Sequence, residues 1–124
     1  TAPAPSTVAA AHAALALARQ LPERATRVQQ LAEWFRSRLN QLGMNTGDSE
    51  SHIVPLIVGA SQKAIALQGI FQASEIFVPA IRPPTVPKGL SRLRFSLTAL
   101  HQQSTLQRLL DILEKNYQSN PVAA

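Results

Sequence analysis

The fold of this chain is constrained most by one proline-rich segment, RPPTVPKG, at residues 82–89. Its prolines remove backbone hydrogen-bond donors and fix φ, so the segment can form neither a helix nor a central strand. The residues that follow alternate, because polar side chains separate Leu93, Phe95 and Leu97. This period of two predicts a strand over residues 90–98 with one buried and one polar face. The segment is therefore predicted to be a stiff turn that leads into a strand.

An alanine-rich run over residues 8–21 predicts the first helix, because alanine has the highest helix propensity. Ser6 or Thr7 is the predicted N-cap. The helix is apolar around most of its circumference. We therefore expect it to be packed between other elements rather than to lie on a surface.

Three more helices are predicted from hydrophobic spacing and end signals. Pro22 suits the first turn of the second helix, and Gly43 ends it. Ser61 is predicted to cap a third helix that runs through Ala73. A fourth helix follows Ser104 and has an apolar stripe made of Leu106, Leu109, Leu110, Leu113 and Tyr117.

Two short apolar runs predict the remaining strands. Residues 53–58 are rich in β-branched side chains and end at Gly59, and Pro55 inside this run suggests an edge position or a bulge at that end. Residues 76–81 form the second run. The order is then ααβαββα, an α+β fold in which a small antiparallel sheet of about three strands is covered by helices. The length of 124 residues fits this one domain, residues 1–124.

Composition argues against several classes of function. The absence of cysteine excludes disulfides and thiolate metal sites and is compatible with the cytoplasm, which is the predicted location. No apolar run approaches the roughly 20 residues of a membrane span, so no membrane partner is expected. His12, His52 and His101 lie too far apart in sequence for metal-ligand spacing. The chain also has no glycine-rich phosphate loop and no nucleophile elbow.

The net charge of +5 is concentrated in one part of the chain. Arg82, Lys88, Arg92 and Arg94 account for most of it and lie in a stretch without an acidic residue. Nucleic-acid modules usually interleave aromatic residues or align cations on one helix face, whereas aromatic residues are only 5% of this chain. A solvated surface is the default interpretation, and no nucleic acid is expected as a partner.

Arg82 is the strongest candidate for binding chemistry. It stands at the predicted end of a strand and is followed by two prolines, so its backbone has little freedom. A guanidinium held in one place suits bidentate binding of a carboxylate, and Thr85 could add a donor to the same ligand. The alternative is a stiff surface turn in which Arg82 pairs with a neighbouring Asp or Glu. From the residues alone the two interpretations carry equal weight.

Three stretches of the sequence resemble a known family: IVPLIVG at residues 53–59, VPAIRPPTVPKG at 78–89 and SRLRFSLTALH at 91–101. They are similar to the C-terminal domain of the α-oxoamine synthases, and within that family to the biotin-pathway branch that makes 8-amino-7-oxononanoate. The RPPTVP core is the most specific part, because other branches tend to lack the Arg-Pro-Pro residues. One departure is Ser74-Glu75, where the family pattern usually has a glycine.

The resemblance implies a pyridoxal 5'-phosphate enzyme of the aspartate-aminotransferase fold type, with this chain as its C-terminal small domain. The implied enzyme is a homodimer that condenses L-alanine with pimeloyl-CoA or pimeloyl carrier protein and releases carbon dioxide and CoA. By the same resemblance Arg82 binds the substrate carboxylate, Thr85 also binds substrate, and Arg94 has a supporting role. The cofactor and its lysine belong to a large domain that this chain lacks. We therefore expect no catalytic, cofactor-binding or metal-binding residue here, and an isolated chain without activity.

Residues 1–7 are the expected connection from the large domain, and residues 119–124 are expected to fray. Two alternatives remain open at this point. One is a stand-alone βαββ-type module that binds an anionic ligand or nucleic acid through the basic turn. The other is a purely structural or dimerisation domain.

Overall fold

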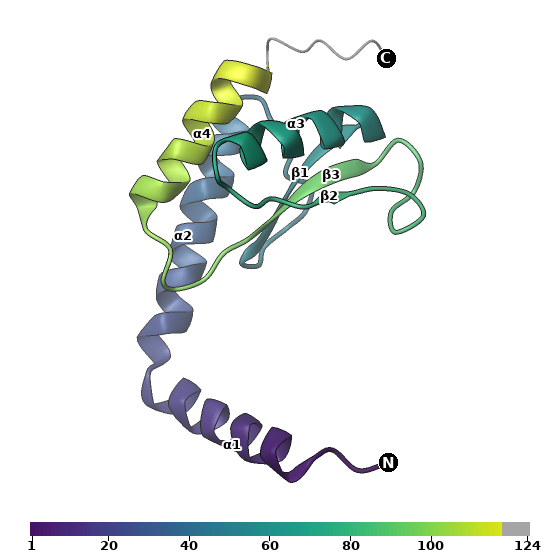
Figure 1. Ribbon diagram of the computed structural model, residues 1–124. Coiled ribbons are helices and arrows are strands. Elements are labelled where there is room, and N and C mark those ends of the chain that lie inside the picture. The colour runs from purple at the N-terminus through teal and green to yellow at the C-terminus, as the bar shows by residue number, and fades with distance from the viewer. Residues whose placement is uncertain (118–124) are drawn as a thin grey trace.

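The computed structural model describes residues 1–117 and has an α+β fold (Figure 1). Its elements are, in order, α1 (Pro5–Gln20), α2 (Pro22–Gln41), β1 (Ile53–Gly59), α3 (Ser61–Ala73), β2 (Ala80–Ile81), β3 (Ser91–Ser96) and α4 (Gln103–Tyr117). This confirms the predicted order ααβαββα and the fold class. The tail predicted to fray, residues 119–124, lies outside the described residues. None of the helices described is long and apolar enough to cross a membrane.

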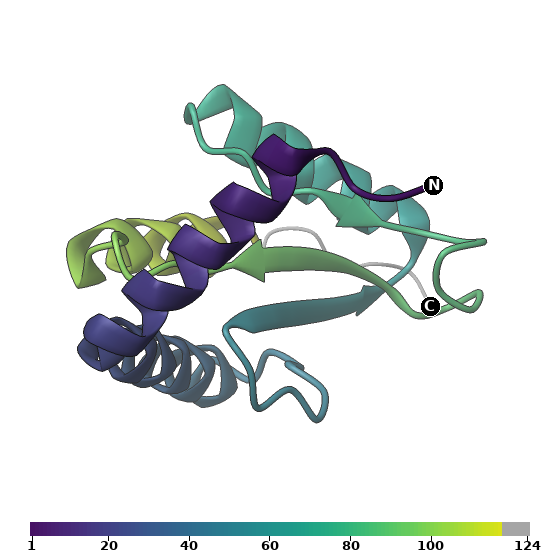
Figure 2. The same cartoon turned by 90° about the horizontal axis from the view of Figure 1, so that it is seen from below.

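The sheet has β3 in the middle, with β1 and β2 antiparallel on either side of it. Pro55 lies in an edge strand, as predicted, and is opposite Arg94 of β3. Phe95 is buried beneath the helices, whereas Arg94 and Ser96 are exposed, which confirms the predicted alternation. The sheet face opposite the core, which carries Pro55, Arg92 and Arg94, is called the open face below. It is turned toward the viewer in Figure 2.

Phe95 joins the sheet to two helices. Its ring centroid lies 5.2 Å from that of Phe35 in α2 and 5.9 Å from that of Phe71 in α3, and both contacts are edge-to-face. Such pairs are worth roughly 0.5–1.5 kcal/mol beyond the area they bury. The predicted stripe of α4 packs into the same core through its buried leucines, which are Leu106, Leu109, Leu110 and Leu113.

The first helix begins earlier than predicted. α1 starts at Pro5, and Ala4 is its N-cap in place of Ser6 or Thr7. The reason is that proline has the φ of a helical first turn and needs no hydrogen-bond acceptor there. Part of the stretch expected to be a connection is therefore helical, and the role of residues 1–7 as a connection stays a prediction.

The expectation that this helix is packed between other elements is wrong for the chain by itself. α1 has no buried residue, and Val8, Leu15 and Leu17 are 53%, 55% and 51% exposed. Within residues 1–117 the only element that contacts α1 is α2. The described residues thus supply too little apolar surface beside α1 to bury it.

The second predicted strand is shorter than expected, since β2 holds only Ala80 and Ile81. Pro79 has no N–H to donate. The N–H of Ala80 donates to Oε1 of Gln68 in α3 at 2.7 Å, so a helix side chain takes this donor. The carbonyl of Pro79 still accepts from the N–H of Arg94 at 3.1 Å. The segment before β2 therefore runs beside β3 without a full ladder of hydrogen bonds.

The start of α3 also differs from its prediction. Ala60 is the N-cap, and Ser61 is the first helical residue. The Oγ of Ser61 lies 3.0 Å from the Oγ of the buried Ser91, which begins β3. This hydrogen bond ties the first turn of α3 to the strand that follows the proline-rich turn.

The end of α3 is a Schellman motif whose left-handed residue is Glu75. The N–H of Ile76 donates to the carbonyl of Phe71 at 2.9 Å, and the N–H of Glu75 donates to that of Gln72 at 3.0 Å. Glu75 has a φ of 61°, a conformation that costs a residue with a side chain about 1–2 kcal/mol. The departure from the family's glycine at Ser74-Glu75 is thus a helix cap with backbone strain.

Replacing Phe95 by alanine is expected to lower the free energy of unfolding by about 3–5 kcal/mol, because a cavity would open between Phe35 and Phe71. Ser96→Ala, on the exposed face of the same strand, is the matched control and should change it by less than about 0.5 kcal/mol. Urea unfolding of the 124-residue chain, followed by circular dichroism, measures both. A loss for Phe95→Ala no larger than that of the control would contradict this account of the core.

Glu75→Gly is expected to raise the free energy of unfolding by about 0.5–1 kcal/mol, since relief of the positive φ exceeds the added entropy of the unfolded chain. Gln72→Gly, at an exposed position inside α3, should instead lower it by about 1 kcal/mol. Thermal unfolding of the two variants tests the difference in sign. Destabilisation by both changes would show that the cap is not strained.

Candidate functional site

The proline-rich residues 82–89 form the turn between β2 and β3, as predicted. In Figure 1 this turn projects beyond the end of the sheet, away from α2 and α4. The carbonyl of Arg82 accepts hydrogen bonds from the N–H groups of Thr85 at 3.0 Å and Val86 at 3.4 Å. These bonds, together with the fixed φ of the prolines, hold the backbone on which the Arg82 side chain stands.

The side chain of Arg82 is exposed and has no partner in the described part of the chain. It forms no hydrogen bond or ion pair within residues 1–117. The interpretation in which it pairs with a neighbouring Asp or Glu therefore has no support from these residues. Thr85, also exposed, lies three residues along the same turn, and its hydroxyl is not used in a hydrogen bond there either. Substrate binding by Arg82 and Thr85 stays a prediction.

The open face carries two further guanidinium groups. Arg92 is opposite both Ile57 of β1 and Ile81 of β2, while Arg94 is opposite Pro55. A cleft of about 500 Å³, called the open-face cleft below, is lined by these side chains together with Ile53 and residues of the loop before β1. Since Arg82 follows Ile81 directly, the cleft ends where the proline-rich turn begins.

The two arginines of the open-face cleft are held differently. The Nε of Arg92 donates to the carbonyl of Leu90 at 3.1 Å, and this side chain is partly buried. Arg94 is exposed, and its side chain has no hydrogen bond within residues 1–117. Asp48 lines the same cleft and forms an ion pair with neither of them. The sequence interpretation grouped Arg92 with a solvated surface. Its strand period was a signal of the shared face, but only the register shows which side chains lie opposite.

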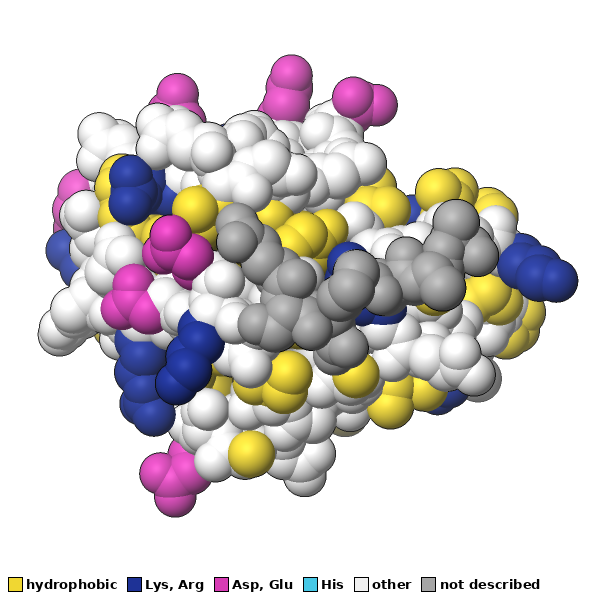
Figure 3. Space-filling view, turned by 90° about the horizontal axis from the view of Figure 1, so that it is seen from above, with side chains coloured by type: hydrophobic (Ala, Val, Ile, Leu, Met, Phe, Trp, Pro, Cys, Tyr) yellow, Lys and Arg dark blue, Asp and Glu magenta, His cyan; other side chains and the backbone are white. Residues whose placement is uncertain are grey.

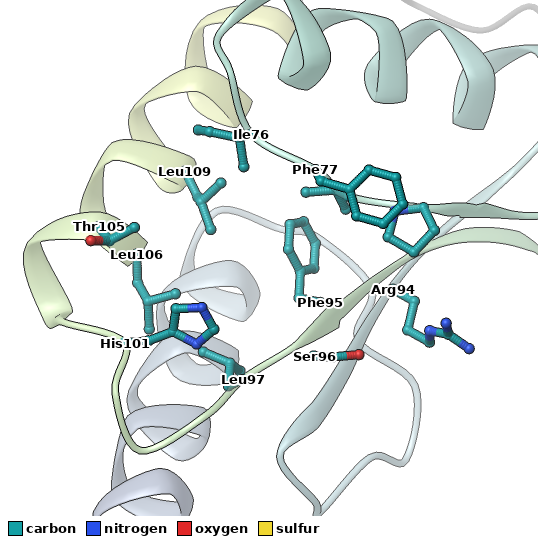
Figure 4. Close-up of a pocket in the computed structure, with 12 residues that line it drawn as sticks. Ile76, Phe77, Arg94, Phe95, Ser96, Leu97, His101, Thr105, Leu106 and Leu109 are labelled. Carbon is teal, nitrogen blue, oxygen red and sulfur yellow. The ribbon is translucent and has the colours of Figure 1, made fainter.

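A second cleft, of about 260 Å³, lies between the segment before β2, strand β3 and helix α4 (Figure 4). Phe77 lines this cleft and is 86% exposed. The Nδ1 of His101 accepts a hydrogen bond from the N–H of Thr98 at 2.9 Å, so this ring nitrogen holds the turn between β3 and α4. In Figure 4 the guanidinium of Arg94 points away from Leu106. Arg94 nevertheless lines both this cleft and the open-face cleft, so the two clefts share this one cation.

The charges are distributed unevenly over the surface. On the face shown in Figure 3 the acidic side chains lie away from the projecting turn, whose end carries a cation. No acidic residue occurs between Glu75 and Asp111 in the sequence. A ligand with negative charge would therefore meet no like-charged residue of this segment at the turn or on β3.

The described residues do not form a site for pyridoxal phosphate. The Nζ of Lys63 lies 4.1 Å from the ring centroid of Tyr117, and Lys88 is exposed in the turn. A lysine that binds this cofactor needs a desolvated pocket beside a cradle for the phosphate, and neither lysine has one. Lys115 is on the exposed side of α4. No group of three potential metal ligands occurs within residues 1–117.

Comparison with known sequences identifies the family. The family model for aminotransferase class I and II matches residues 1–113. The 8-amino-7-oxononanoate synthases of Cellvibrio japonicus and Serratia proteamaculans are 43% and 42% identical to this chain over 113 residues, which is 91% of it. The chain spans only 28% and 30% of the length of these two relatives.

Solved structures show the same fold. An 8-amino-7-oxononanoate synthase from Francisella tularensis matches 78% of this chain with a TM-score of 0.67 at 23% identity, and the match covers 28% of that protein. A serine palmitoyltransferase from Sphingomonas wittichii matches 80% of this chain with a TM-score of 0.70 at 24% identity and is covered to 25%. These two likenesses concern the fold alone, whereas the family model matches most of the sequence. The chain therefore belongs to the aminotransferase class I and II family.

Proposed function

We propose that this chain is the C-terminal small domain of a pyridoxal-phosphate-dependent acyltransferase of biotin biosynthesis. The complete enzyme condenses L-alanine with pimeloyl-CoA, or with pimeloyl carrier protein, to give 8-amino-7-oxononanoate, carbon dioxide and CoA. It acts in the cytoplasm as a homodimer. The proposal is supported by relatives of this name at 42–43% identity and by the RPPTVP turn, the part of the sequence that most specifically resembles that branch of the family.

The chain's contribution is a binding site for the carboxylate of the amino acid. The guanidinium of Arg82, exposed and unpaired among the described residues, is the observation that supports this role. Its guanidinium is exposed and unpaired within residues 1–117, while its backbone carbonyl is held by two hydrogen bonds. A guanidinium can donate two parallel N–H groups to the two oxygens of a carboxylate, which fixes the orientation of the ligand as well as its position. Because the turn is already ordered, little conformational entropy is lost on binding.

Thr85 and Arg94 complete the proposed binding surface. The hydroxyl of Thr85 is on the same turn as Arg82 and is available to donate to a carboxylate oxygen. Arg94 projects from the open face of β3, and its positive charge raises the potential near the turn without any contact to the ligand. Arg94 thus supports the site from a distance.

The cofactor belongs to the large domain in this proposal. Pyridoxal phosphate acts in such enzymes as an electron sink for the amino acid. The described residues of this chain neither bind it nor form a cradle for its phosphate, so every covalent step is assigned to residues outside the chain. The small domain binds and orients one end of the substrate.

Arg82→Ala in the complete enzyme is expected to raise KM for L-alanine by about tenfold to a hundredfold, because a charged hydrogen-bonded pair is lost. Arg82→Lys should have an intermediate effect, since an ammonium group keeps the charge and loses the fork. Lys88→Ala removes a cation from the same turn and is the matched control. Steady-state kinetics at varied L-alanine measure all three. A KM for Arg82→Ala equal to that of Lys88→Ala would leave the turn with a structural or dimerisation role.

The isolated 124-residue chain is expected to leave the absorption spectrum of added pyridoxal phosphate unchanged. The physical reason is that none of its lysines has a desolvated pocket. Intact mass after borohydride reduction provides the second readout and should show no stoichiometric attachment of the cofactor to a single lysine, because exposed amines react with it only weakly and unselectively. Specific attachment at one lysine would contradict the assignment of the cofactor to another domain. Salt-dependent binding of generic DNA by the same chain would favour the stand-alone module instead.

A further inference from the structure

Helix α1 exposes apolar side chains on opposite sides. Val8 and Leu15 are seven residues apart, close to two helical turns, so they lie on one side. Leu17 comes two residues after Leu15, which places it about 200° around the helix. Each of the three side chains is more than half exposed. A helix that is apolar on opposite sides is normally enclosed by other elements, because cover on one side leaves the other in water.

The described chain encloses neither side of α1. The helix contacts α2 and no other helix or strand among the described elements, and the chain changes direction between Gln20 and Pro22. In Figure 1 α1 stands away from the body formed by the sheet and the other helices. In Figure 2 it passes in front of the open face. α1 and the open face therefore border the same region of space.

α1 also lacks the features that stabilise a helix alone in water. It has 16 residues, close to the length at which isolated helices are marginal. Its first turn contains no acidic residue, its N-cap makes no side-chain hydrogen bond, and Arg19 is its one charged residue. The helix therefore depends on tertiary cover for its stability.

We propose that the large domain of the same polypeptide encloses α1 on both sides, so that α1 is structurally part of that domain and the boundary of the small domain falls at Leu21. This inference rests on the proposed function, which places a large domain in the polypeptide. The share of the relatives that this chain spans, 28% and 30%, leaves most of their length to form that domain. The same domain would cover the open face, where Ile53 is 40% exposed.

A second copy of this chain is a poorer occupant. Two α1 helices that pack against each other cover one side of each helix. Either the side with Val8 and Leu15 or the side with Leu17 would then stay in water. A domain that receives the helix in a groove covers both sides at once, which is what the positions of the exposed side chains require.

Amide hydrogen exchange of residues 5–20 tests the proposal without any substitution. In the isolated 124-residue chain these amides should exchange within about tenfold of the rate of an unstructured peptide. In the full-length polypeptide they should exchange at least about a hundredfold more slowly. Equal rates in the two proteins would overturn the proposal. Slow exchange that depends on the concentration of the isolated chain, and is no slower in the full-length polypeptide, would overturn it in favour of a second copy.

Two substitutions test whether both sides are covered. In the full-length polypeptide Leu15→Gln and Leu17→Gln should each lower the melting temperature by about 2–4 °C or more. Leu100→Gln, at a position 89% exposed, is the matched control and should leave it unchanged. In the isolated chain none of the three changes should have an effect. Sensitivity at only one of the two α1 positions would overturn cover on both sides.

These results can be distinguished from the results that test the proposed function. Exchange rates and melting temperatures do not require catalysis, whereas the role of Arg82 is read from KM for L-alanine. If α1 is covered and KM for L-alanine is unchanged by Arg82→Ala, the carboxylate site is contradicted and the domain boundary is supported. If α1 is not covered and Arg82→Ala raises KM for L-alanine, the carboxylate site is supported and the domain boundary is contradicted.

Discussion

The edge-to-face contacts of Phe95 with Phe35 and Phe71 fix the rotation of β3, and the geometry of the binding surface depends on that rotation. Successive residues of a strand point to opposite faces, so burial of Phe95 under the helices sends Arg94 to the open face. Antiparallel pairing then sets Arg92 beside Ile81, the last residue before Arg82. The apolar core thus decides where the cations of this domain stand.

Much of this arrangement follows from sequence pattern, since the alternation in β3, the stripe of α4 and the edge position of Pro55 each have a local cause. The failures have both local and nonlocal causes, since a proline starts α1 early whereas a contact with another element shortens β2. β2 is short because Gln68 of α3 takes the N–H of Ala80, and no local pattern predicts that contact. The stiff turn was predictable from its prolines, whereas the unpaired state of Arg82 depends on which acids the fold brings near.

Among the described residues, helix α1 lacks a partner that buries it and the side chain of Arg82 lacks a partner for its charge. α1 presents apolar surface without cover, and Arg82 presents a charge without a counter-ion within residues 1–117. In a domain that folds and acts alone, the apolar surface of such a helix is normally buried and the charge of such an arginine is normally paired. Both features are explained if a large domain supplies the apolar cover and holds the carboxylate ligand. The chain spans only 28% and 30% of the length of two relatives, which leaves room for such a domain.

The central claim is that Arg82 binds the carboxylate of the amino acid substrate. A crystal structure of the full-length polypeptide with its cofactor and L-alanine tests it most directly. The account predicts two guanidinium nitrogens of Arg82 within about 2.7–3.0 Å of the two carboxylate oxygens. A guanidinium that points into bulk solvent, or that pairs with a carboxylate of the protein while L-alanine is bound elsewhere, would contradict it.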